Sequence, residues 1–171
     1  MRNLQKSVAF VLVGVMLVGS SPGAFGQSKF LAWLRQRVGA SKVKDAGQAK
    51  EAEKWQKEHF ASPAAREAFV ANLKKVTCFT CHQKGQAKEI RNPFGAELSK
   101  LLRKQLKMDG EAITAAVKSS APEDVQQKVQ AGLYECFDKA LEMPVDPKGD
   151  KADTYAARVK KGELPYPPPQ E

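Results

Sequence analysis

The sequence predicts an all-α protein. Apolar residues recur at helical spacing in several segments, with polar residues between them. Proline, glycine and N-capping residues stand where these segments begin and end. Segments with the alternating pattern of strands are nearly absent. With 171 residues, of which 42% are hydrophobic, the chain suits one domain with a modest core.

The first 26 residues have the composition of a secretory signal peptide. Arg2 and Lys6 form a basic start, residues 8–18 form an apolar run of 11 residues, and small residues at 24–26 offer a cleavage site before Gln27. The run is short for a membrane span, and an uncleaved anchor is the alternative interpretation. We therefore expect an exported, periplasmic protein with no stable membrane insertion after cleavage.

Residues 27–60 are expected to form an N-terminal helical extension. A short amphipathic helix over residues 30–38 contains Trp33 and Leu34, and Gly39 ends it. Residues 42–60 are rich in Lys, Glu, Ala and Gln, which predicts an exposed helix carrying Trp55 and His59.

The next helix is expected to begin at Ser62-Pro63, with Ser62 as its N-cap and Pro63 in its first turn. It opens a second region, residues 61–164. Its apolar residues are spaced to form one buried face that leads directly toward Cys78: Ala65, Phe69, Leu73 and Val76.

The rest of this region is also expected to be helical. Helices are predicted over residues 95–106, from Asp109 through residue 117, over residues 121–143 and over residues 155–161. The longest of them carries Cys136 within an apolar stripe, so we expect a buried, unreactive thiol. Residues 165–171 form a proline-rich tail that is expected to be extended.

The stretch Cys78-Phe79-Thr80-Cys81-His82 carries the chemistry of this sequence. The pattern C-x-x-C-H is typical of c-type haem attachment. In such sites the two thiols bond to the haem, and the adjacent histidine ligates the iron from one face. The motif therefore predicts one haem c per chain, with Cys78 and Cys81 as thioethers and His82 as the proximal ligand.

The iron then needs a ligand on its other face, and electron-transfer cytochromes use Met or His there. Met143 is favoured, because it precedes Pro144 where the longest helix gives way to a loop. His59 is the alternative distal ligand, Met108 a weaker one, and an open or solvent-bound site is the fourth possibility. Either methionine could instead be core filling, and His59 could be an ordinary surface histidine.

These residues resemble a known family. The export signal, the C-x-x-C-H motif, Pro93 and Met143-Pro144 are similar to the small monohaem cytochromes c of class I. The stretches Arg91-Asn92-Pro93-Phe94-Gly95 and Lys160-Lys161-Gly162-Glu163-Leu164-Pro165 resemble a group of small exported bacterial cytochrome-like proteins.

The resemblance covers residues 61–164 and implies cytochrome c-like helices wrapped around one covalently attached haem. It implies that Pro93, 11 residues after His82, offers its carbonyl to the His82 imidazole, and that Leu98 packs on the haem. The segment before residue 77 is longer than the usual lead helix, and the usual long C-terminal helix is replaced here by a short one.

The favoured function is electron transfer between redox partners, without an enzymatic activity, because no acid, base or nucleophile is implied. An open sixth position would instead give a ligand sensor or a peroxidase-like site. A redox-active dithiol, or zinc bound by Cys78, Cys81, His82 and Cys136, is the third alternative. A dithiol would need a strand-to-helix context and zinc a second closely spaced pair, and the sequence shows neither.

The charge of the chain favours an acidic redox partner. The formal net charge is +9, and cleavage after Gly26 would remove two of the 28 basic residues and none of the 19 acidic ones. Basic residues flank the haem motif at Lys74, Lys75, Lys84, Lys88 and Arg91. A basic rim there would steer an acidic protein toward the haem. Nucleic acid is not expected as a partner, because acidic residues alternate with these charges.

Overall fold

The computed structural model describes residues 23–43, 45–76, 81, 91–118, 120–150 and 152–166. In these residues the chain forms helices and no strand, which confirms the all-α prediction for the described part. The helices are α1 (Gly23–Arg37), α2 (Ala46–His59), α3 (Pro63–Val76), α4 (Pro93–Leu106), α5 (Gly110–Ala116), α6 (Glu123–Leu141) and α7 (Tyr155–Lys160).

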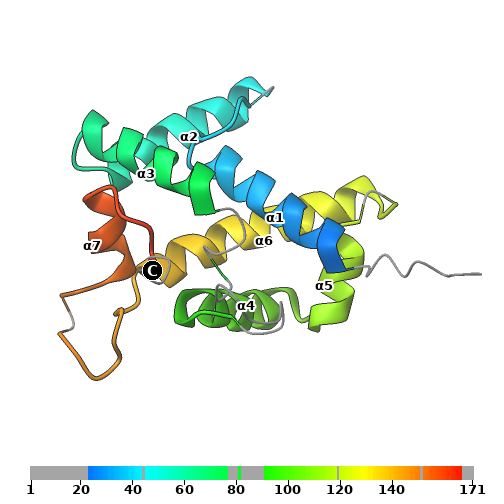
Figure 1. The fold of residues 1–171 in the computed structure, drawn as a ribbon. Helices are drawn as coiled ribbons and strands as arrows, with labels where there is room; N and C mark the ends of the chain where they lie inside the picture. Colours follow the sequence, from blue (N-terminus) through cyan, green and yellow to red (C-terminus); the bar gives the residue numbers. More distant parts are fainter. Residues whose placement is uncertain are drawn as a thin grey trace, which may run out of the picture.

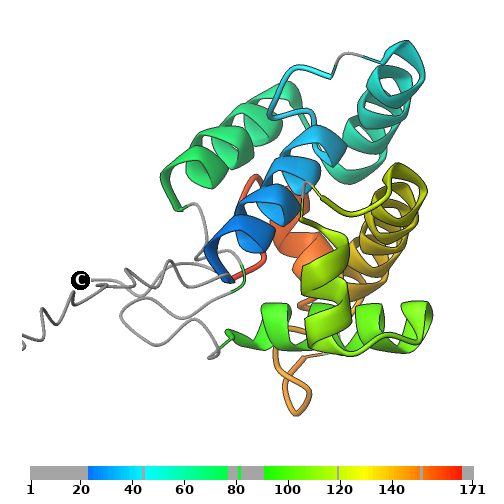
Figure 2. The same cartoon turned by 90° about the vertical axis from the view of Figure 1, so that its right-hand side faces the viewer.

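Helix α6 is the element against which most of the others pack. It contacts α4 most extensively, and it also contacts α1, α5 and α7. Figure 1 shows α2 and α3 above α6, α4 below it and α7 at its C-terminal end. The turned view in Figure 2 separates α1 from α6, with α1 on the side where the chain enters α4. Helix α3, which precedes the C-x-x-C-H motif, and α4, which follows it, thus lie above and below α6 in the view of Figure 1.

Side-chain caps set several helix boundaries. Ser62 accepts a hydrogen bond from the Ala65 N–H (3.1 Å), and Asp109 accepts one from the Ala112 N–H (2.8 Å). Both caps are as predicted. Asp45 and Thr154 cap α2 and α7 in the same way, although the sequence analysis did not assign them. These bonds satisfy N–H groups that have no partner within a helix.

A chain of aromatic rings forms the centre of the core. Trp55 of α2 contacts Phe60 and the α6 residue Phe137, with ring centroids 5.7 and 6.0 Å apart. Phe94 of α4 contacts Phe137 at 5.7 Å and Tyr155 of α7 at 5.1 Å. These edge-to-face and tilted contacts join α2, α4, α6 and α7 around one apolar centre.

The N-terminal extension belongs to this same core. Its side chains Trp33, Leu34, Val38 and Trp55 are buried in one cluster with residues of α4 and α6. The residues on the two sides of the predicted boundary between residues 60 and 61 thus pack into one core. Helix α1 begins at Gly23, so it starts before the predicted position and includes the predicted cleavage site after Gly26.

Among the described residues, no helix combines the length and the apolar character that crossing a membrane requires. The apolar run at residues 8–18, on which the signal-peptide prediction depends, lies outside the described residues. The prediction of export therefore stays a prediction.

Candidate haem site

Cys81 is the one residue of the C-x-x-C-H motif that the structure describes. It is half-buried and packs against the edge of the core. Cys78, Phe79, Thr80 and His82 lie outside the described residues, so their predicted roles stay predictions. What the structure does describe is how the rest of the chain receives Cys81.

Asn92 holds the Cys81 backbone at the beginning of α4. The Asn92 N–H donates a hydrogen bond to the Cys81 carbonyl oxygen (3.0 Å). Its side-chain Oδ1 accepts a hydrogen bond from the Gly95 N–H (2.8 Å), which caps α4. Asn92 is fully buried, so both bonds are shielded from water. One residue thus fixes the start of the helix and the position of Cys81 together.

Gly95 allows this close approach. A Cβ atom at residue 95 would lie 2.1 Å from the Cys81 carbonyl oxygen and 2.8 Å from the Cys81 Cα. Because both atoms belong to the backbone, no side-chain rotation could relieve the collision. The first turn of α4 is therefore shaped around the peptide of Cys81. Neither Asn92 nor Gly95 was given a role in the sequence analysis, although Asn directly before Pro is a helix N-cap signal.

The second stretch that resembles cytochrome-like proteins, residues 160–165, packs against the beginning of α3. Gly162 has a positive φ of 86°, and a Cβ there would lie 2.4 Å from the Ala65 carbonyl oxygen. The Ala61 N–H donates to the Lys160 carbonyl oxygen (3.0 Å), and Leu164 is buried. Because α3 leads to Cys78, this turn anchors the segment that enters the haem motif.

The structure describes both residues that were predicted to support the haem. Pro93 is the first residue of α4 and is exposed, while Leu98 is buried on the same helix. The Pro93 carbonyl lies in the first turn, where helix geometry directs it to an N–H four residues later. A bond from His82 would use the second lone pair of that oxygen, and it stays a prediction.

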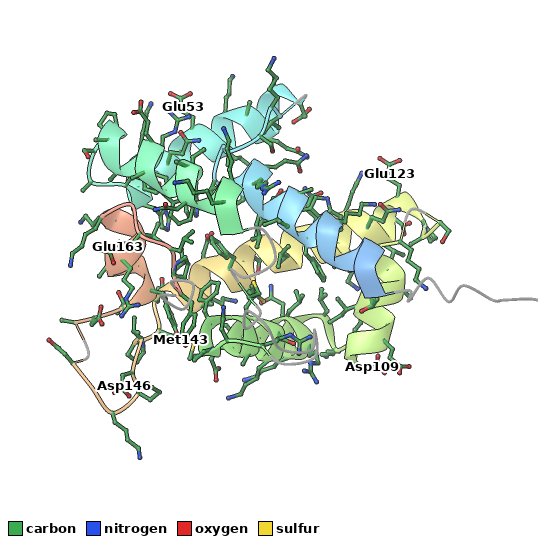
Figure 3. The ribbon with its side chains drawn as sticks, in the orientation of Figure 1. Glu53, Asp109, Glu123, Met143, Asp146 and Glu163 are labelled. Atoms are coloured by element: carbon green, nitrogen blue, oxygen red, sulfur yellow. The ribbon has the colours of Figure 1, made fainter. Side chains whose placement is uncertain are left out.

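Met143 lies beside the beginning of α4. Its N–H donates to the Ala140 carbonyl oxygen (3.2 Å), and its carbonyl accepts from the Tyr155 N–H (3.1 Å). The Tyr155 ring in turn packs on Phe94, the second residue of α4. Figure 3 shows Met143 at this end of the helix. Met143 is partly buried. The hydrogen bonds of its N–H and its carbonyl fix its backbone near the N-terminal end of α4, where Asn92 contacts Cys81.

The other two candidate distal ligands lie elsewhere. Met108 follows Lys107, the residue that caps the C-terminal end of α4. At 1.5 Å per residue, that end is roughly 20 Å from the end that binds Cys81. The ring of His59 stacks on Trp55, with centroids 4.1 Å apart, and its Nδ1 lies 2.9 Å from the Trp55 carbonyl oxygen. Helix α2, which carries both, lies across α6 from α4 (Figure 1).

Cys136 is fully buried on α6, as predicted. Burial raises the pKa of its thiol above the ordinary value, which keeps it protonated and weakly nucleophilic. Its Sγ lies 3.6 Å from Oε1 of Gln105. Gln105 is near the C-terminal end of α4, whereas Cys81 contacts the N-terminal end. Within the described ranges there is no group of three or more His, Cys, Asp and Glu side chains placed to hold a metal ion.

The basic residues around the motif are described in part. Lys74, Lys75 and Arg91 are exposed, and Lys84 and Lys88 lie outside the described residues.

The chain matches no protein-family model, and no curated protein or solved structure is significantly similar to it.

Proposed function

We propose that this protein is an exported c-type cytochrome that carries single electrons through one haem attached to Cys78 and Cys81. One observation carries the proposal: a C-x-x-C-H motif whose second cysteine is seated by Asn92 and Gly95. The close packing at Gly95 fixes the Cys81 peptide against the beginning of α4. Two thiols two residues apart, followed directly by an imidazole, are the residue types that covalent haem attachment uses.

Each side chain has a distinct role in this proposal. When bound, the haem supplies a one-electron iron couple. Cys78 and Cys81 would hold it covalently, His82 would ligate its iron, and Pro93 would orient the His82 ring. The buried side chains Phe94 and Leu98 lie near the start of α4 and would keep water from the haem face.

The first experiment measures the mass of the protein made in a host with haem maturation machinery. We expect the intact chain to exceed the mature polypeptide by one haem, because thioether bonds survive denaturation. The matched control replaces both Cys78 and Cys81 with Ala, which should remove the added mass. Haem that acidic organic solvent extracts from the unmodified protein, leaving a chain without added mass, would contradict the proposal.

Met143 is the proposed distal ligand, because it is fixed at the α4 end that seats Cys81. Met143→Ala should leave the haem attached, lower its reduction potential and let exogenous ligands bind. Met108→Ala and His59→Ala are the matched controls and should keep the low-spin absorption spectrum of the unmodified protein.

Two results would redirect this assignment. If His59→Ala loses the low-spin spectrum while Met143→Ala keeps it, His59 is the ligand. A high-spin spectrum in the unmodified protein would indicate an open sixth position, which suits a sensor or a peroxidase-like site.

A further inference from the structure

The outer face of α4 carries a row of four cations, which we call the basic row. Its members are exposed and recur at spacings of three and four residues: Lys100, Arg103, Lys104 and Lys107. Residues at these spacings lie on one face of a helix, so the row is about 10 Å long. The opposite face includes the buried residues Phe94, Leu98 and Leu102, and α4 packs on α6. Helix α4 is therefore divided along its length into a buried apolar face and an exposed basic face.

The described residues neutralise little of this charge. Lys100 lies 3.7 Å from the carboxylate of Glu97, but 78% of the Lys100 side chain is exposed to water. Arg103 donates to the neutral hydroxyl of Ser99 at 3.3 Å. The two other members of the basic row form no ion pair with another described residue. Asp109, the next acidic residue along the chain, uses its side chain to cap α5.

Lys107 occupies a backbone conformation that lysine rarely adopts. It ends α4 with a φ of 54° and a ψ of 39°, in the left-handed region where glycine is the usual residue. Among the described residues, no other non-glycine residue has a positive φ. A Cβ atom makes this conformation less favourable, so glycine would form the same turn more easily. What lysine adds at this position is an exposed charge at the end of the basic row.

The shape of this side of the molecule favours a protein over a lipid surface as the partner of the basic row. Figures 1 and 2 show α4 along the lower edge of the molecule, with the loop after α6 (residues 142–150) extending below it. That loop carries the exposed Asp146, which is labelled in Figure 3. A flat anionic membrane would meet this loop before it met the basic row. A rod-shaped segment, by contrast, can lie along α4 beside the loop.

We propose that the basic row is a docking surface for an acidic helix of another protein. Carboxylates three and four residues apart on such a helix would face the cations of the row along its whole length. This inference goes beyond the proposed function and does not depend on a haem. The row begins seven residues after Pro93, the first residue of α4, so it starts about 10 Å from the helix end that contacts Cys81. The competing explanation is that cations near the C-terminal end of α4 only stabilise the helix dipole.

The test measures the binding of a fluorescently labelled helical peptide to the full chain by anisotropy, at low and at physiological salt. The peptide carries four glutamates with the spacing of the basic row. We expect it to bind, and we expect a second peptide with the same glutamates spread around the helix to bind more weakly. The double variant Lys104→Glu, Lys107→Glu should weaken binding of the first peptide by about tenfold or more. No binding of the first peptide at low salt would overturn the proposal.

The matched control is the double variant Lys54→Glu, Lys57→Glu on α2. It changes the net charge by the same amount, at lysines that lie 3.8 and 2.9 Å from the carboxylates of Glu58 and Glu53. We expect it to lower the affinity for the peptide far less. Equal losses in the two double variants would show that the peptide responds to net charge alone, and the basic row would then be an ordinary solvated face.

Lys107→Gly separates a role in binding from a role in the helix. Glycine relieves the left-handed conformation, so the urea concentration at the midpoint of unfolding should not fall. The affinity for the peptide should fall, because one cation of the row is lost. A variant that loses stability and keeps its affinity would show that Lys107 serves only the helix dipole, and the proposal would be wrong.

Vesicles of phosphatidylglycerol and phosphatidylcholine test lipid as the alternative partner. Co-sedimentation with these vesicles should not depend on the basic row, because the loop after α6 keeps a flat surface away from it. If the protein binds the vesicles through Lys104 and Lys107 more tightly than it binds the peptide, the surface is built for lipid and the assignment to a protein partner is wrong.

Discussion

Gly95 occupies a helix position where the side chain of any other residue would displace the peptide of Cys81. Glycine within a helix is less favourable than alanine by about 1 kcal/mol, so a glycine in the first turn of α4 weakens the helix by itself. The 2.1 Å separation between a Cβ at residue 95 and the Cys81 carbonyl oxygen explains its presence. The cost in helix propensity is offset by the close contact with the Cys81 peptide.

Gly95→Ala should therefore destabilise the protein despite the better helix propensity of alanine. We expect a loss of about 1–3 kcal/mol, as for an overpacked core, and a lower yield of covalent haem. Urea unfolding measures the first effect, and the ratio of haem absorbance to protein measures the second.

Gly110→Ala in α5 is the matched control for this change. No heavy atom lies within 4 Å of the Cβ position at residue 110, so the substitution should be neutral or stabilising by up to about 1 kcal/mol. If both alanine variants behaved alike, the close approach at Gly95 would have no part in haem attachment.

At the scale of the helices, local sequence signals were sufficient to predict the helices and their order along the chain. They were not sufficient to predict which helices pack against each other. Ser62 and Asp109 capped the predicted helices because capping depends only on neighbours along the chain. The network around Asp138 was not predicted, since Arg37 and Trp55 are separated from it by 101 and 83 residues. The role of Gly95 was not predicted either. It depends on the Cys81 peptide, and the spacing of apolar residues along the sequence does not show that this peptide lies beside Gly95.

Asp138 of α6 joins both helices of the extension. Its Oδ2 accepts from Arg37 of α1 (2.6 Å), and its Oδ1 accepts from Nε1 of Trp55 on α2 (2.7 Å). Trp55 is buried, so its indole N–H would otherwise lack a partner. A single carboxylate on the central helix therefore fixes how α1 and α2 pack.

Asp138→Asn should destabilise the protein by about 1–3 kcal/mol, because it leaves the Arg37 cation without a counter-charge. Urea unfolding of the haem-loaded protein measures this loss. Asp153→Asn is the matched control: Asp153 pairs with Arg158 at 3.3 Å, and 51% of its side chain is exposed. Its loss should be below about 1 kcal/mol. Equal losses in the two variants would show that Asp138 is no more than a surface ion pair.

At the scale of the whole molecule, the extension and the region after residue 60 form one body. The sequence analysis placed a boundary there, before the helix that begins at Ser62-Pro63, and expected residues 42–60 to form an exposed helix. The outer face of α2 is exposed, but its inner face contributes Ala52 and Trp55 to the common core. The few buried positions of a mostly exposed helix are a weak periodic signal, which is why the sequence did not reveal that α2 belongs to the core.

The distribution of charge over the molecule is the basis for proposing an acidic redox partner. Lys74 and Lys75 lie in the last turn of α3, and Arg91 precedes α4. All three are exposed, on the two segments that flank the C-x-x-C-H motif. On α2, by contrast, Lys54 and Lys57 lie close to Glu58 and Glu53, which balance their charge locally. The positive potential that an approaching partner meets should therefore be strongest beside the haem motif.

This difference predicts how salt affects electron transfer. With a small anionic redox reagent, the bimolecular rate should fall as ionic strength rises, because screening shortens the reach of the positive potential to about 10 Å at 0.1 M salt. With a cationic reagent the rate should rise instead.

Charge reversal at Lys74 and Lys75, or at the flanking Lys84 and Lys88, should weaken both trends. Charge reversal at Lys54 and Lys57 changes the net charge of the protein by the same amount. Because Glu58 and Glu53 already balance these two lysines locally, it should leave most of the salt dependence in place. Rates that follow net charge alone, with the two pairs of substitutions giving equal effects, would mean that the basic residues at the motif are simply solvated and that no docking surface is built there.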